Sequence, residues 1–205
     1  MQTIVAYVSH KPGVLNRVGS LARRLNINID SLTVGPTEMP GVARMTIVVN
    51  TDQGGAHRLE ASLENLVDVQ LAEIITGRPA VERDLALIKV VANQNSRPHL
   101  MDLIKVFRAR VVDVSPDSLI VEVSGETDKI DGLLEVLRPF GVLEMARSGS
   151  VAMTRGSTLL QPPGKPPIEA AGATAAGDAA HAAKETAGSG HGSETIESEM
   201  EINEA

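Results

Sequence analysis

The chain has 205 residues, no cysteine, one tyrosine, two phenylalanines and no tryptophan, and its 26 acidic residues outnumber its 19 basic ones. The absence of cysteine excludes disulfides, thiolate nucleophiles and cysteine-ligated metals, which fits a reducing compartment. No apolar run approaches the ~18 residues of a membrane span, and the N-terminus lacks the basic start and long apolar core of a signal peptide. We therefore expect a cytoplasmic protein of one or two domains, with no membrane partner.

The first predicted elements place a glycine at a helix entrance. Residues 3–9 form an apolar strand, and the chain then turns through Pro12 and Gly13 into a helix. The apolar residues of this helix recur with helical spacing: Val14, Leu15, Val18, Leu21, Ala22 and Leu25. Pro12 suits a first helical turn because its missing N–H loses no bond there, and Gly13 has no Cβ to keep a ligand from the backbone. The helix start therefore offers free amides and a positive dipole end to a carboxylate.

The remaining elements give the two halves of the chain one shared order, β-α-β-β-α-β. In the first half, strands are predicted at residues 29–34, 43–50 and 69–75, and a helix contains Ala56, Leu59, Leu63 and Leu66. In the second half, strands are predicted at residues 85–92, 110–114, 119–124 and 142–153. Its two helices contain Leu100, Leu103, Ile104 and Phe107, and Ile130, Leu133, Leu134 and Leu137. This order predicts an α+β protein with two ferredoxin-like domains, over residues 1–78 and 79–156.

The last part of the chain has a different composition. From Ser157 onward there are two basic and eight acidic residues, against 17 and 18 before it. This part also holds four prolines between Pro162 and Pro167, followed by runs of Ala, Gly, Ser, Thr and Glu. Such a composition buries too little apolar surface to offset chain entropy. We predict a disordered tail over residues 157–205.

The predicted topology suggests a site that two copies share. In a ferredoxin-like sheet of order 4-1-3-2, the second strand lies at an open edge where another copy can add. The first and second strands run parallel, so Gly13 and Asn28 lie at opposite ends of the sheet. If two copies pair antiparallel through their second strands, Asn28 of one comes beside Gly13 of the other. An alternative interpretation makes Asn28 a helix-terminal residue that tolerates left-handed conformation.

Such a site would suit a small amino acid. Amides at the helix start would bind the carboxylate, and the Asn28 carboxamide would accept a hydrogen bond from the ammonium. Val14, Leu15 and Ile29 would surround a short aliphatic side chain.

The residues resemble one family over about residues 1–156. The segments that carry the resemblance are PGVLNRV, NINIDSLTVGPTE, ARMTIVV, LVDV and VERDLALIKV, then VVDVSPDSLIVEVSG and MARSGSVAMTRG. They are similar to the small, regulatory subunit of acetolactate synthase, also called acetohydroxyacid synthase. The resemblance implies an N-terminal ACT domain that forms a homodimer, and a C-terminal domain characteristic of these small subunits.

The same resemblance implies a regulatory function in the biosynthesis of valine, isoleucine and leucine. The partner would be the large catalytic subunit, which carries thiamine diphosphate, magnesium and usually FAD, while this chain would bind no cofactor. By this resemblance, the small subunit would raise the activity of the catalytic subunit and confer feedback inhibition by valine. Gly13 and Asn28 would then stand at the family's effector-binding positions, with Val14, Leu15 and Ile29 beside them. His10 departs from the pattern, because many relatives have Asn there, and a histidine makes effector affinity more dependent on pH.

The sequence bears on three other functions. An enzyme acting alone is not supported, because the five histidines show no metal-ligand spacing and no acidic pair lies in a catalytic motif. Binding of RNA by this fold requires aromatic side chains, yet only Tyr7, Phe107 and Phe140 are present and basic residues are not in excess. The arginines form two groups, at positions 23 and 24 and at positions 108 and 110. They are solvated residues at the ends of helices and strands, or one of the two groups faces the catalytic subunit. The remaining alternative is an ACT-domain sensor that regulates a different metabolic enzyme.

Overall fold

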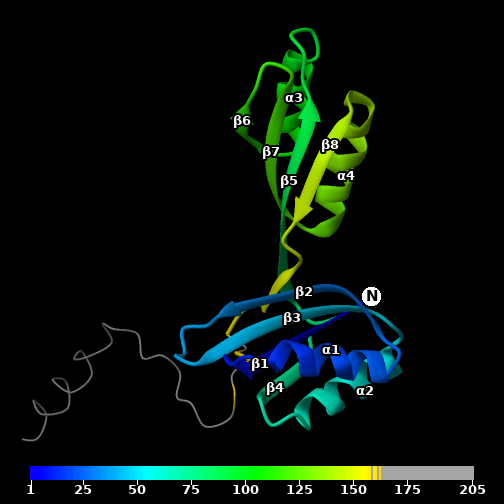
Figure 1. The fold of residues 1–205 in the computed structure, drawn as a ribbon, viewed down its shortest axis with the longest axis vertical. Helices are drawn as coiled ribbons and strands as arrows, with labels where there is room; N and C mark the ends of the chain where they lie inside the picture. Colours follow the sequence, from blue (N-terminus) through cyan, green and yellow to red (C-terminus); the bar gives the residue numbers. More distant parts are fainter. Residues whose placement is uncertain (158, 161, 163–205) are drawn as a thin grey trace, which may run out of the picture. The chain divides into compact units, whose positions relative to one another are not determined.

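The computed structural model describes residues 1–157, 159–160 and 162. These residues contain two ferredoxin-like α+β domains, as predicted, which we call the first and the second domain (Figure 1). The predicted tail lies almost entirely outside the described residues. Within the described part of the chain, no helix is long and apolar enough to span a membrane.

The first domain is a four-stranded antiparallel sheet with two helices on one face. Its strands are β1 (Gln2–Ser9), β2 (Asn28–Pro36), β3 (Val42–Asn50) and β4 (Val69–Ile74), in the order β2-β3-β1-β4. Helices α1 (Val14–Arg24) and α2 (Gln53–Glu64) lie side by side on that face (Figure 1). Alternate residues of β1 point toward the helices, so Ile4, Ala6 and Val8 share one core with residues of α1 and α2. As predicted, β2 lies at the edge of the sheet.

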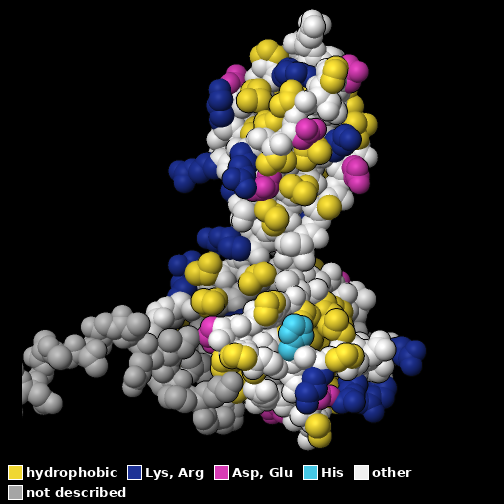
Figure 2. Space-filling model, turned by 60° about the vertical axis from the view of Figure 1, so that its left-hand side comes forward, with side chains coloured by type: hydrophobic (Ala, Val, Ile, Leu, Met, Phe, Trp, Pro, Cys, Tyr) yellow, Lys and Arg dark blue, Asp and Glu magenta, His cyan; other side chains and the backbone are white. Residues whose placement is uncertain are grey.

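The second domain repeats this plan. Strands β5 (Ala80–Val91), β6 (Arg110–Val114), β7 (Ser118–Gly125) and β8 (Val142–Arg147) are arranged in the order β6-β7-β5-β8. Helices α3 (Arg97–Val106) and α4 (Thr127–Leu137), followed by the 3-10 turn η1 (Arg138–Phe140), pack on one face. On the opposite face Leu85 and Leu87 are 40% and 39% exposed, and Figure 2 shows hydrophobic side chains among charged ones on this domain.

The strand predicted over residues 142–153 is wrong, because the structure contains two strands there. Strand β8 ends at Arg147, and β9 (Val151–Thr154) follows after a break at residues 148–150. Gly149 lies in the break with φ +83°, a conformation incompatible with a regular strand. Strand β9 pairs with residues 80–83 of β5, which begins five residues before the predicted start.

The pair formed by β9 and the start of β5 packs on the first domain's sheet, on the face opposite the helices. Val5 and Tyr7 of β1 form a small core there with Ala152 of β9 and Leu160, and Ala80 packs against it. Arg44 donates a hydrogen bond to the Ala152 carbonyl at 2.8 Å and another to the Tyr7 hydroxyl. Both faces of the first sheet are therefore packed.

Candidate functional site

The start of α1 has the features of an anion-binding helix terminus. Gly13 is the N-cap residue with φ +89°, which L residues rarely adopt, and no side chain in the described part of the chain caps the helix. The first amides of a helix have no intrahelical acceptor, so these donors point outward. A Cβ at Gly13 would meet no atom within 4 Å among the residues that the structure describes, which leaves the approach to the amides open on their side. The predicted role of Gly13 is therefore compatible with its geometry.

A hollow of about 360 Å³ lies at this helix start and is lined by residues 8–15, Val34, Ala43 and Met45. Its base is apolar, because Val8, Ala43 and Met45 are buried in the core. Leu15 and Val34 line the hollow while remaining 51% and 37% exposed. The hollow therefore combines an apolar base with outward-pointing amides, the combination that an aliphatic amino acid needs.

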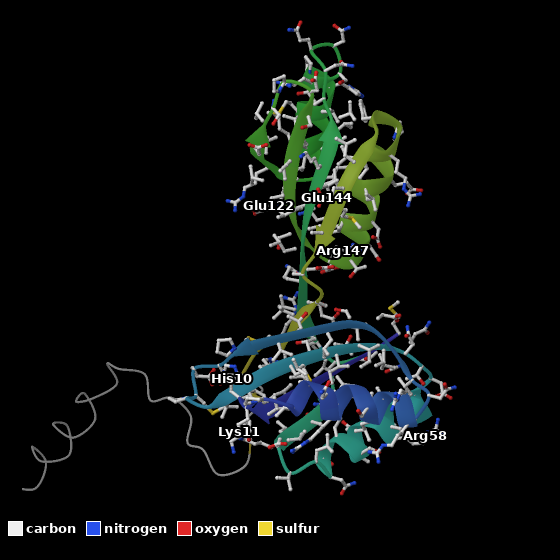
Figure 3. All side chains as sticks on the ribbon, in the orientation of Figure 1. His10, Lys11, Arg58, Glu122, Glu144 and Arg147 are labelled. Carbon is white, nitrogen blue, oxygen red and sulfur yellow. The ribbon has the colours of Figure 1, made fainter. Side chains whose placement is uncertain are left out.

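Two polar residues line the same hollow. His10 and Lys11 are exposed and lie together at one end of the first domain, whereas Arg58 of α2 lies at the other end (Figure 3). The ammonium of Lys11 adds a positive charge close to the helix start, where the dipole already favours an anion. Sequence reasoning missed Lys11, although a cation two residues before an uncapped helix start was a usable signal.

Asn28 lies at the opposite end of α1, at the first position of β2. Its side-chain nitrogen donates to Asp30 Oδ1 at 2.8 Å, so the carboxamide oxygen is the atom oriented to accept a further bond. The left-handed residue after α1 is Asn26, with φ +53°. The alternative interpretation, in which Asn28 takes that conformation, is therefore wrong.

A second hollow of about 400 Å³ is lined by Gly19, Ala22, Arg23 and residues 26–29. It contains Asn28, which is exposed, and Ile29, which is half-buried. The 11 residues of α1 span about 16 Å at the rise of an α-helix. Within one chain the structure thus brings together His10, Gly13, Val14 and Leu15, but it holds Asn28 and Ile29 at a distance from them.

The edge strand β2 lies between these two hollows. It pairs with β3, and the register shifts between Ile29 and Ser31, which makes Asp30 the residue of a bulge. The other backbone edge of β2 has no strand beside it in the described chain. An open edge of this kind is a template for pairing with another chain.

Three of the four predicted arginines have local structural explanations. Arg23 and Arg24 lie in the last turn of α1, where a cation interacts favourably with the helix dipole. Arg110 pairs with Glu122 on the neighbouring strand at 2.7 Å. Among the residues that the structure describes, no group of three or more His, Cys, Asp or Glu side chains is arranged to hold a metal ion.

Each of the two domains matches a known protein family model. Residues 4–70 match a family model described as an AHAS small subunit-like ACT domain, and residues 83–156 match one described as small subunit of acetolactate synthase. The solved acetolactate synthase small subunit of Thermotoga maritima has a TM-score of 0.71 and 33% identity, covering 77% of this chain and 98% of that one. The described part of the chain therefore belongs to the class of proteins built from ACT-type ferredoxin-like domains.

Curated relatives narrow this class further. The probable acetolactate synthase small subunit of Methanothermobacter thermautotrophicus is 45% identical over 155 residues, covering 75% of this chain and 92% of that protein. The acetolactate synthase small subunit of Bacillus subtilis is 43% identical over 155 residues, covering 75% and 90%. This chain belongs to the acetolactate synthase small-subunit family.

Proposed function

We propose that this chain is the regulatory subunit of an acetolactate synthase in the cytoplasm. It binds the large catalytic subunit, raises its activity, and confers feedback inhibition by valine on branched-chain amino-acid biosynthesis. Thiamine diphosphate, magnesium and FAD belong to the catalytic subunit in this proposal, and the small subunit performs no catalysis. The observation that carries the proposal is an uncapped, glycine-started helix beside an apolar hollow, in a chain that belongs to this family.

The proposed effector site lies between two protomers that pair antiparallel through β2. A two-fold axis places Asn28 and Ile29 of one protomer beside Gly13 of its partner, and the same contact occurs twice. This arrangement is supported by the open edge of β2 and by the separation of the two hollows along α1. The proposed limits are residues 1–78 for the pairing domain and residues 79–156 for the second domain.

Each part of valine then has a chemical partner. The α1 amides and Lys11 bind the carboxylate, because both contribute positive charge at the same end of the helix. The Asn28 carboxamide oxygen accepts from the ammonium. Val14, Leu15 and Ile29 surround the isopropyl group over the apolar base of the hollow, which excludes polar side chains by leaving their hydrogen bonds unmade.

Inhibition requires that valine bind one arrangement of the holoenzyme better than another. Valine between the protomers changes how the two β2 strands pair, and this favours a less active arrangement of the catalytic subunit. A ligand shifts such an equilibrium only by its difference in affinity for the two states. A coupling free energy of about 1–3 kcal/mol gives the several-fold to hundred-fold effects typical of allosteric enzymes.

The test is acetolactate formation by the cognate large subunit, with and without this chain, across a valine titration. Activation that valine reverses is the expected result. Activation without valine sensitivity keeps the partner but removes valine as the effector. No activation at all favours the second candidate, an amino-acid sensor for a different enzyme, which retains the same hollow but is disfavoured by the match over residues 83–156.

A further inference from the structure

The break between β8 and β9 is tightly packed against the back of β2. We call residues Ser148–Ser150 the hinge segment. The Ser150 amide donates to Ser31 Oγ at 3.1 Å, and the Thr33 hydroxyl approaches the Ser148 carbonyl at 3.5 Å. Ser31 and Thr33 belong to β2, where their neighbour Leu32 packs against the helix-side core. Side chains alternate along a strand, so β2 faces the core on one side and the hinge segment on the other.

Gly149 makes this contact possible. A Cβ added there would lie 2.5 Å from Ser31 Oγ and 2.8 Å from Thr33 Oγ, distances that real Cβ atoms do not show. The φ of +83° independently disfavours any other residue. The backbone of the hinge segment therefore lies directly on the hydroxyl groups of β2, with no side chain between them to absorb a displacement.

The hinge segment also forms hydrogen bonds with the second domain. The Ser148 amide donates to the Leu85 carbonyl at 2.9 Å, and the Leu85 amide donates to Ser148 Oγ at 3.1 Å. Ser148 Oγ in turn donates to Asp84 Oδ1 at 3.1 Å. Asp84 is only 7% exposed and pairs with Arg147, which also reaches Asp131 on α4 at 2.9 Å.

These contacts form a continuous connection from β2, the strand that carries the proposed effector residues, to the second domain. At its start β2 carries Asn28 and Ile29, and Val34 lines the hollow at Gly13. Between these positions, Ser31 and Thr33 contact the hinge segment. Closely packed elements move in discrete steps rather than deform continuously, so a change in how β2 pairs is transmitted to residues in contact with it.

We propose that Ser31, Thr33 and Gly149 are positioning residues that transmit effector binding at β2 to the second domain through the hinge segment. This inference rests on the proposed function, because it takes β2 as the strand that the effector moves. None of the three residues touches the effector. Their loss uncouples inhibition from binding and leaves the binding itself in place.

The main test is the double variant Ser31→Ala/Thr33→Ala, which removes both hydroxyls and keeps the strand. Valine binding to the small subunit, measured by calorimetry, is expected to stay close to wild type, and activation of the catalytic subunit without valine is retained. Residual activity at saturating valine is expected to rise by about threefold or more, within the range that mutations along such contacts produce. Ser124→Ala, an exposed strand serine of β7, is the control. Full inhibition in the double variant would overturn the proposal.

Gly149→Ala tests the close approach itself, with Gly156→Ala as its matched control. Both glycines have positive φ, +83° and +76°, but a Cβ at Gly156 would meet no atom of the described residues within 4 Å. The two variants therefore share the backbone strain, and Gly149→Ala alone collides with β2. We expect Gly156→Ala to retain valine inhibition and Gly149→Ala to lose it. Equal inhibition in both variants, after thermal unfolding has shown both to be folded, contradicts the role of the contact.

Hydrogen exchange separates a failure of this inference from a failure of the proposed function. Without any valine, Ser31→Ala/Thr33→Ala is expected to speed amide exchange at Ser150 and Leu85, while Ser124→Ala leaves it unchanged. If the wild-type chain does not bind valine, the proposed function fails, and the exchange result still tests the contact between β2 and the hinge segment. If the wild type binds valine but exchange in the double variant matches the control, the inference is wrong and the proposed function stands.

Discussion

The two domains share one order of elements, but they differ at the point where a ligand would bind. In the first domain Gly13 is the N-cap of α1, and no side chain of the described residues caps this helix. In the second domain α3 also lacks a side-chain cap, but the amide of Arg97, its first residue, donates to the Asn93 carbonyl at 3.0 Å. Pro98, the next residue, has no N–H to offer a ligand.

The residue that begins the strand after this helix also differs between the two domains. Asn28 begins β2 in the first domain, whereas Arg110 begins β6 in the second domain and is paired with Glu122. A carboxamide there accepts a hydrogen bond from an ammonium, and a guanidinium repels it. The shared ferredoxin-like frame therefore does not by itself define a ligand site. In the proposed function, a few residues at the two ends of α1 make the first domain the copy that binds an amino acid.

The largest expected effect comes from placing an acid at the open helix start. Gly13→Asp adds bulk and a negative charge where the carboxylate of valine would bind, and like charges held together cost several kcal/mol. We expect valine affinity to fall by about 100-fold or more on that basis, with activation of the catalytic subunit intact. The measurement is a valine titration of acetolactate formation.

Gly77→Asp is the matched control for this change. Gly77 also has a positive φ, +79°, so it shares the backbone strain, and no atom of the described residues lies within 4 Å of its Cβ position. It does not line the hollow at α1, and its variant is expected to remain valine-sensitive. A fully inhibited Gly13→Asp enzyme would place the effector elsewhere.

A smaller effect is expected at the other end of the helix. Asn28→Ala removes the acceptor for the ammonium, and a hydrogen bond to a charged group contributes about 1.5–3 kcal/mol, or roughly 10- to 100-fold in valine affinity. Arg110→Ala, at the corresponding position of the second domain, removes only an exposed ion pair worth about 0–1 kcal/mol of stability. Calorimetry with valine should separate the two variants, and equal affinities would remove Asn28 from the site.

Much of the architecture of the two domains was predictable from the sequence. The order of elements and the edge position of β2 follow from apolar periodicity and the known strand order of the fold. The break at Gly149 was missed because strand-like apolar residues stand on both sides of it, and only the pairing partner separates β8 from β9.

Two details of the site also depended on tertiary structure. Val34 lines the hollow through its register with Met45, which no local pattern reveals. Asn26 and Asn28 are both suited to a left-handed position, and the structure alone assigns it to Asn26.

Lys11 is expected to contribute less than Asn28, because it lies exposed at the rim. Lys11→Gln removes the charge and keeps most of the length of the side chain. An exposed charge interaction is worth about 0.2–1 kcal/mol, so valine affinity is expected to fall by no more than about fivefold. Added salt screens exposed charges, so the difference between Lys11→Gln and wild type should shrink in titrations at high ionic strength. A difference that does not depend on salt would show that Lys11 acts through packing.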